Sequence, residues 1–179
     1  MCIQTDRSIK CYIRFIFFFV LILFLGASKT ILATPAKIEI DITTHMGNST
    51  EFLDGDEITF LLSLNQDCHI LVIYQNARNE IYQLLPNRNH STSFFRKGSF
   101  RPLPAPDAPF VFKAEPPFGK ETIWVFAADV PLPKLDGENL KSGLRKLKQG
   151  IVLLRNKIHL HPKQAYGETS LILRTQPRN

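Results

Sequence analysis

Three apolar runs of strand length, separated by two short polar breaks, occupy residues 57–87. In the first run every second residue is apolar (Ile58, Phe60, Leu62 and Leu64), a period of two that is typical of a half-buried strand. The second run, residues 68–74, is apolar on both faces, as in a strand that is covered on both sides. The third run, residues 81–85, follows a polar segment that favours a turn. This stretch predicts an antiparallel meander around which the rest of the chain must pack.

Further strands are predicted on either side of the meander. Residues 36–43 alternate between isoleucine and charged residues, which is typical of a strand at a sheet edge. Strand patterns also occur at residues 110–114, 121–129, 151–160 and 169–175, with a short one at residues 91–95. Residues 101–109 hold four prolines, so we expect an extended connector outside the sheets.

One helix is predicted, beginning at Asp136 and ending before Gly150. Leu140, Leu144 and Leu147 repeat at helical spacing and form a narrow apolar stripe. The opposite face would then carry the basic residues Lys141, Arg145, Lys146 and Lys148. Many short strands with one helix favour an all-β fold: an immunoglobulin-like antiparallel β-sandwich with one short amphipathic helix near the C-terminus.

The first 33 residues are predicted to be a signal peptide. Basic residues precede an unbroken apolar run at residues 15–25, and small residues follow it. Cleavage is expected after Ala33, with Ser28 as the alternative, which leaves residues 34–179 as a single domain. The run is shorter than the roughly 20 residues of a spanning helix. An uncleaved membrane anchor is therefore the minor alternative to export into the periplasm or the extracellular space.

The charge distribution bears on possible partners, and the cysteine content bears on the core. Residues 134–179 carry ten Lys/Arg and three Asp/Glu, whereas residues 34–133 carry eight and twelve. The basic C-terminal part could contact an anionic partner, although a solvated helix face with charged strand edges explains it more simply. Cys68 is the single cysteine after the signal segment and opens an apolar strand, so we expect a buried, inert thiol.

Four motifs in order resemble the domain of unknown function family 4384. They are a Gly-Asp turn before a strand (Gly55, Asp56), an Asp-Cys strand entry at residues 67–68, a Leu-Leu-Pro-Asn strand exit (Pro86, Asn87) and a Pro-Phe-Gly corner (Pro117, Phe118, Gly119). The resemblance covers about residues 38–131, and the chain departs from it at His69, where an aromatic residue is usual. It implies a β domain of bacterial exported and envelope proteins, and it transfers no catalytic residue.

Three local clusters are candidate sites. His159 and His161 have the spacing of metal ligands on a strand, with Glu168 as a third group, but exposed strand-end histidines are the simpler interpretation. The acidic group at Asp54, Asp56 and Glu57 lacks the spacing of a calcium loop. Residues 94–98 contain an aromatic pair followed by a basic pair. They could bind a glycan or an anionic polymer, but phenylalanines packed in the core are the simpler interpretation.

The sequence contains no nucleophile elbow, P-loop or dinucleotide-binding glycine pattern. We therefore predict a non-catalytic binding or structural module of the bacterial cell envelope, with no cofactor and no metal. The expected partner is a protein or an anionic envelope polymer, not nucleic acid, and no stable membrane span is expected after signal cleavage. The alternative is a small periplasmic hydrolase whose site is assembled from distant residues.

Overall fold

The computed structural model describes residues 37–163 and 165–179. The predicted signal peptide lies outside these residues. The described part of the chain forms the following elements in order: β1 (Ile40–Thr44), β2 (Glu51–Leu53), β3 (Glu57–Ile58), β4 (Phe60–Leu64), β5 (Cys68–Gln75), β6 (Ile81–Leu85), β7 (Phe94–Phe95), β8 (Gly98–Leu103), β9 (Phe112–Lys113), β10 (Gly119–Ala128), β11 (Gly137–Asn139), β12 (Arg145–Leu147), α2 (Ile151–His159) and β13 (Tyr166–Gln176).

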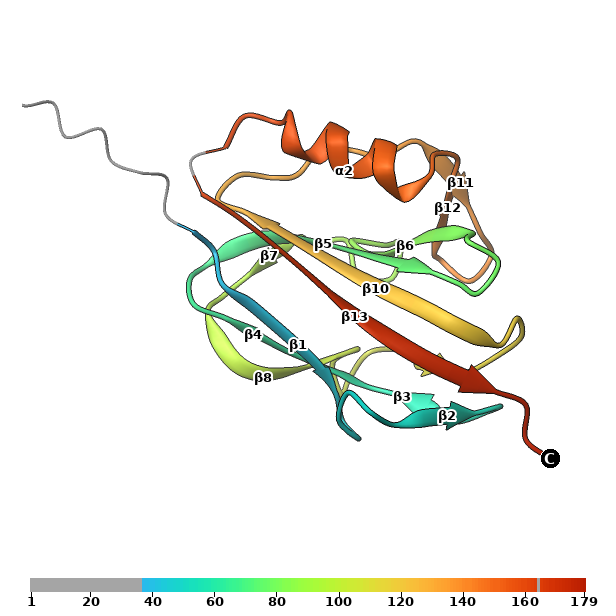
Figure 1. Cartoon of the computed structure of the whole chain (residues 1–179). Helices are drawn as coiled ribbons and strands as arrows, with labels where there is room; N and C mark the ends of the chain where they lie inside the picture. Colours follow the sequence, from blue (N-terminus) through green and yellow to red (C-terminus); the bar gives the residue numbers. More distant parts are fainter. Residues whose placement is uncertain (1–36, 164) are drawn as a thin grey trace, which may run out of the picture. The chain divides into compact units, whose positions relative to one another are not determined.

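The larger sheet has the strand order β11-β12-β6-β5-β10-β13-β2, and β7 pairs with one end of β5. All of its pairs are antiparallel except β13 with β2. The smaller sheet has the order β1-β4-β8, and β3 pairs with β9. Figure 1 shows the smaller sheet below the larger one and α2 above it. The predominantly β architecture is therefore confirmed.

Each face of the larger sheet covers its own hydrophobic cluster. Between the two sheets, alternate residues of β4 (Phe60, Leu62) face alternate residues of β5 (Ile70, Val72). On the other face, Leu154 and Ile158 of α2 pack against β5 and β10 in a second cluster. The residues of this second cluster are Leu71, Ile73, Ile81, Phe126, Leu135, Leu147, Leu154 and Ile158. A strand covered on both sides must be apolar on both faces, as the sequence of β5 predicts.

The predicted helix at residues 136–150 is wrong, because this segment is a hairpin made of β11 and β12. Leu144 packs against the inter-sheet cluster, whereas Leu147 belongs to the cluster below α2. One helical stripe could not reach both clusters, and Gly143, with a φ of +89°, forms the turn instead. Gly150 does not stop a helix but precedes one.

The strand predicted at residues 151–160 is also wrong, because residues 151–159 form α2. Leu154 and Ile158, one helical turn apart, are buried, while Val152, Leu153 and Leu160 are exposed. The exposed apolar residues fill the positions between the buried ones, so the run looks continuously apolar, as a buried strand does.

The proline-rich segment is partly a strand. Arg101 and Leu103 belong to β8, and Pro102 lies opposite Leu61 of β4. The expected connector outside the sheets is therefore wrong for residues 101–103. Proline is tolerated there because β8 is the edge strand of the smaller sheet, so the missing N–H interrupts no further pairing.

Candidate functional site

The Gly55-Asp56 turn joins β2 to β3 and is held by contacts within the protein. Gly55 has a φ of +83°, a conformation that favours glycine, and its N–H donates to the carbonyl of Ala114 at 2.9 Å. One carboxylate oxygen of Asp56 accepts a hydrogen bond from the N–H of Leu53 at 2.8 Å. This predicted motif therefore fixes a turn.

The acidic residues around this turn also form contacts within the protein. The guanidinium of Arg178 pairs with Asp56 and donates to the carbonyl of Asp54 at 3.1 Å. Glu57 lies 3.7 Å from the ammonium of Lys113. These basic partners tie the C-terminal residues and β9 to the turn, which explains the acidic group without a calcium ion.

The Pro-Phe-Gly corner begins β10. The N–H of Gly119 donates to the hydroxyl of Thr175 in β13 at 3.1 Å, which aligns the start of β10 with the end of its antiparallel partner β13. Phe118 is half-buried, and Pro117 lines a cavity between the sheets. The corner thus positions two strands and one wall of a cavity.

The Leu-Leu-Pro-Asn exit of β6 has a dense set of hydrogen bonds. The side-chain carbonyl of Asn87 accepts from the backbone N–H of Asn89 at 2.8 Å and of His90 at 2.7 Å. Its amide donates to the carbonyl of Leu84 at 2.7 Å, and the amide of Gln83 donates to the carbonyl of Pro86. Asn87 therefore shapes the loop that leaves the sheet here.

Pro86 and Asn87 line a cavity of about 540 Å³, which we call the basic pocket. Its walls come from the ends of β5 and β6, the loop before β7, the segment after β10 and the β11–β12 hairpin. The lining residues are Ile70, Leu71, Gln83, Pro86, Asn87, Arg88, Ser91, Ser93, Leu132, Pro133, Lys134, Asn139, Gly143 and Arg145.

Hydrogen bonds join two walls of the basic pocket. The N–H of Arg88 donates to the carbonyl of Gly143 at 3.1 Å, and the amide of Asn89 donates to the carbonyl of Ser142 at 3.3 Å. Arg145 is held across its own hairpin, since its guanidinium donates to the side chain of Asn139 at 3.1 Å and to the carbonyl of Leu135 at 3.0 Å. The pocket is thus formed by segments that support one another.

The charge of the basic pocket has one sign. Arg88, Lys134 and Arg145 line it, and no aspartate or glutamate among residues 37–163 and 165–179 does. Guanidinium and ammonium groups form strong, charge-assisted hydrogen bonds with phosphate or carboxylate oxygens. The arrangement is suited to hold an anionic group.

A serine and a histidine meet at the same pocket. The hydroxyl of Ser93, which lines the cavity, lies 2.8 Å from Nδ1 of His69. His69 stands edge-on to the ring of Phe94, with ring centroids 5.4 Å apart. A nucleophilic serine needs a base that a third group orients, and the ring of Phe94 has no acceptor for that task.

The basic face predicted for a helix does not exist. In β12, adjacent side chains point to opposite faces of the sheet, so Arg145 lines the basic pocket while Lys146 donates to Glu80 on the other face. Lys141 and Lys148 are exposed and lie outside the basic pocket. The basic residues are divided between two faces by the strand geometry.

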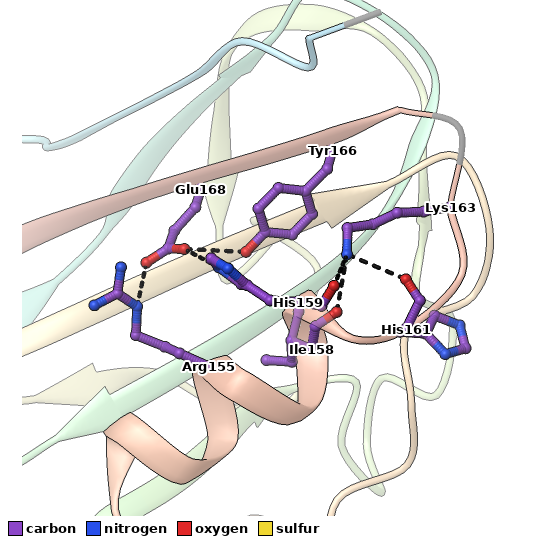
Figure 2. Close-up of polar contacts among 7 residues, drawn as sticks. All are labelled: Arg155, Ile158, His159, His161, Lys163, Tyr166 and Glu168. Atoms are coloured by element: carbon purple, nitrogen blue, oxygen red, sulfur yellow. Dashed lines mark hydrogen bonds and ion pairs between the residues drawn. The ribbon is translucent and has the colours of Figure 1, made fainter. Parts of the chain in front are cut away.

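His159 and His161 lie at the end of α2 and diverge (Figure 2). Nε2 of His159 lies 2.9 Å from a carboxylate oxygen of Glu168, whereas Nε2 of His161 lies 2.9 Å from the carbonyl of Pro131. Among residues 37–163 and 165–179, no group of three or more His, Cys, Asp or Glu side chains could hold a metal ion. The strand spacing behind the metal hypothesis is absent because this segment is helical.

Glu168 instead anchors α2 to β13. It pairs with Arg155 at 2.7 Å and accepts a hydrogen bond from the Tyr166 hydroxyl at 3.0 Å. Burial raises the pKa of Glu168, but His159, Tyr166 and Arg155 together outweigh burial and hold the pKa below its usual range. Lys163 donates to three carbonyl groups at the end of the helix (Figure 2). We interpret this cluster as structural.

The aromatic pair in residues 94–98 is divided between core and surface. Phe95 packs against the inter-sheet cluster, as the simpler interpretation predicts, whereas Phe94 is 47% exposed. The N–H of Lys97 donates to Asp67 at 2.8 Å, while the side chains of Arg96 and Lys97 are exposed. Only one ring of the pair is therefore available at the surface.

Cys68 is buried in the inter-sheet cluster. Burial, with a smaller effect of Asp67, raises the pKa of its thiol to about 11. The prediction that this thiol is buried is confirmed, and a raised pKa keeps a thiol protonated at neutral pH.

Residues 51–131 match the family described as Domain of unknown function (DUF4384). No curated protein was found to match the chain, and no solved structure was found to match it. Within the part of the chain that the structure describes, no helix is long and apolar enough to cross a membrane. The matched residues run from β2 past β10 and include the motifs at Gly55, Pro86 and Pro117. The match over residues 51–131 confirms the resemblance to this family that the motifs predict.

Proposed function

We propose that this chain is an exported, non-catalytic module of the bacterial cell envelope that binds a phosphate or carboxylate group of an anionic polymer in the basic pocket. The observation that carries the proposal is the charge of the pocket: Arg88, Lys134 and Arg145 line it without a carboxylate. The opposing walls are joined by hydrogen bonds, so little ordering is needed when a ligand binds.

Binding of polyphosphate by the full chain, measured calorimetrically at two salt concentrations, tests this proposal. The variant Arg88→Glu/Lys134→Glu is expected to lose roughly tenfold in affinity, the equivalent of about 1.4 kcal/mol, because two attractive charges become repulsive. Binding to the unmodified chain is expected to weaken as salt is added.

Lys120→Glu is the matched control, since Lys120 is an exposed lysine that does not line the pocket. Equal losses in the control and the double variant would assign the binding to net charge alone. Polyphosphate that does not bind, in an assay where a protein partner does, would favour the other predicted partner class.

Export is supported by the signal-peptide pattern of residues 1–33. Fractionation of cells that express the full chain, followed by N-terminal sequencing, tests it. We expect an exported product that begins at Thr34. A cytoplasmic product that begins at Met1 would contradict export.

We further infer that the two facing sheets form an immunoglobulin-like sandwich. The proposal is supported by the apolar cluster between the sheets and by the antiparallel pairs β1–β4, β5–β6 and β5–β10. The parallel pair of β13 with β2 adds an edge strand to the larger sheet. Comparison of an experimental structure with known immunoglobulin-like domains would test it, and a different strand connectivity would contradict it.

A small hydrolase is the second candidate, and the contact between Ser93 and His69 favours it. A Ser93→Ala variant separates the candidates. If the full chain hydrolyses p-nitrophenyl acetate faster than buffer and Ser93→Ala abolishes that rate, the module is catalytic. We expect equal rates for the chain and the variant, because the group that contacts His69 beside Ser93 is the ring of Phe94, which cannot orient the histidine as a carboxylate would.

A further inference from the structure

A second cavity, which we call the aromatic cleft, has a volume of about 480 Å³ and shares no lining residue with the basic pocket. It lies at the end of the inter-sheet core, where β5, β6 and β10 meet the β3–β9 pair. The lining residues are Ile58, Phe60, Tyr74, Asn76, Arg78, Glu80, Tyr82, Leu84, Val111, Phe112, Lys113, Glu115, Pro116, Pro117, Glu121, Ile123, Ser142, Leu144 and Leu173.

Two tyrosine rings form an aromatic platform in this cleft. Tyr74 and Tyr82 are directly opposite each other in the β5–β6 pair, and their rings stack with centroids 6.0 Å apart and an interplanar angle of 29°. Phe112 adds a third ring at the β9 side. Each ring is only partly buried, so aromatic surface remains in contact with the cavity.

The polar groups around the platform are held in place. Glu80 accepts hydrogen bonds from the amide of Asn76 at 2.8 Å, from the hydroxyl of Tyr82 at 3.1 Å and from Lys146. These donors, Lys146 first, lower the pKa of Glu80 to about 2, so the carboxylate is charged at neutral pH. A charged carboxylate with fixed orientation is a directional hydrogen-bond acceptor.

A second carboxyl group lies deeper in the cleft. Glu121 is only 4% exposed and accepts a hydrogen bond from the hydroxyl of Thr175 at 3.1 Å. Burial raises the pKa of Glu121, and hydrogen bonds from Tyr74 and Thr175 oppose that rise. The buried part of the cleft lining therefore contains a polar group as well as apolar side chains.

The charges of the cleft have both signs, unlike those of the basic pocket. Arg78 and Lys113 line it together with Glu80, Glu115 and Glu121. A simple anion would meet these carboxylates, and a purely apolar ligand would leave the polar groups without hydrogen bonds. The combination suits a neutral ligand with one apolar face and many hydroxyl groups.

We propose that the aromatic cleft binds a carbohydrate, with a sugar ring stacked on the tyrosine platform and its hydroxyl groups hydrogen-bonded to the polar rim. The C–H face of a pyranose carries partial positive charge and meets the negative face of an aromatic ring. Sugar hydroxyls both donate and accept, which matches a rim with carboxylate acceptors at Glu80 and Glu115 and a guanidinium donor at Arg78.

Titration of the full chain with three neutral oligosaccharides, maltohexaose, cellohexaose and N-acetylchitohexaose, followed by calorimetry, tests the proposal. We expect saturable binding of at least one of them. Tyr82→Ala removes half of the platform and is expected to weaken that binding roughly tenfold, whereas Tyr82→Phe keeps the ring and is expected to retain it within about threefold.

Phe94→Ala is the matched control, because Phe94 is an exposed ring outside the cleft. Thermal unfolding checks that each variant is folded. The absence of saturable binding for all three sugars up to about 10 mM, or equal binding by a folded Tyr82→Ala variant, would overturn the proposal. Arg88→Glu/Lys134→Glu is expected to bind the sugar normally, so failure here is distinguishable from failure of polyphosphate binding.

Discussion

The basic pocket and the aromatic cleft lie on opposite faces of the same pair of strands. Arg145 of β12 lies beside Gln83 of β6, and both line the basic pocket. One residue further along, Lys146 lies beside Tyr82, on the side of the aromatic cleft. Because side chains alternate along a strand, this single register supplies the guanidinium of Arg145 to one cavity and an aromatic ring with its neighbouring ion pair to the other.

This comparison shows that the chemistry of each cavity depends on what covers the sheet. The basic pocket is closed by loops that bring Arg88 and Lys134 without carboxylates. The aromatic cleft is closed by the β9 region, which brings Phe112 and Glu115. Changes that act on one face should leave the other face intact, and changes in the shared hairpin should affect both.

The largest effect is expected from Leu84→Ala, which acts on the face of the aromatic cleft. Leu84 is 3% exposed and belongs to the inter-sheet cluster, so its truncation leaves a cavity and should cost about 3 kcal/mol of unfolding free energy. Urea denaturation monitored by Trp124 fluorescence measures the loss. Leu153→Ala is the control, since Leu153 is 60% exposed on α2, and a comparable loss there would contradict the assignment of the core.

The shared hairpin is tested by Gly143→Ala. Gly143 has a φ of +89°, and an added Cβ would lie 2.8 Å from the side-chain amide of Asn89. We expect a loss of about 1–2 kcal/mol in unfolding free energy and weaker binding of both polyphosphate and the sugar. Gly150→Ala is the control, because an added Cβ there meets nothing within 4 Å. Loss of only one binding activity would show that the hairpin does not support both cavities.

Adjacent residues of β12 should have opposite effects. Arg145→Gln is expected to weaken polyphosphate binding roughly fivefold and to leave sugar binding unchanged, whereas Lys146→Met should do the reverse. Calorimetric titration of each variant with polyphosphate and with the sugar measures the two affinities. If both variants lose the same activity, the two side chains do not serve separate cavities.

The smallest effect is expected in the pH dependence of stability. The pKa of Glu80 is lowered from 4.5 to about 2 in the folded protein, so its contribution is present above about pH 4.5 and is lost as the pH falls toward 2. Urea denaturation should therefore show that the free energy of unfolding declines as the pH falls from 6 to 2. The variant Glu80→Gln should show a smaller decline. Glu138→Gln, at an exposed residue of β11, serves as the control. An unchanged decline in Glu80→Gln would exclude this ion pair as its source.

Glu121, on the same face, should act with the opposite sign. Burial raises its pKa, so the folded protein holds this proton more tightly than the unfolded chain, and its contribution to stability decreases as the pH rises. The two carboxyl groups of the aromatic cleft are thus distinguishable in one set of denaturation curves.

Local pattern in the sequence determined the strands that build the cores, but the predicted three-strand meander is wrong, because β4 pairs with β1 and β8 in the smaller sheet while β5 and β6 pair in the larger one. The period of two at Ile58, Phe60 and Leu62 predicts a strand with one buried face, and all three are buried. The continuous apolar run of β5 predicts cover on both sides, and the structure provides it with the smaller sheet and α2. Four ordered motifs also identified the family from the sequence.

Only the tertiary structure decided the hairpin and the two cavities. Leu140, Leu144 and Leu147 fit helical spacing. In the structure, however, Leu144 and Leu147 pack into different hydrophobic clusters on opposite faces of the larger sheet, and the spacing of residues in the sequence cannot reveal this. Arg88 lies far along the chain from Lys134 and Arg145, and the pairing of β12 with β6, together with the adjoining loops, brings the three residues to one cavity. A local pattern encodes which side of an element is buried, whereas the partner that buries it is set by the packing of the whole chain.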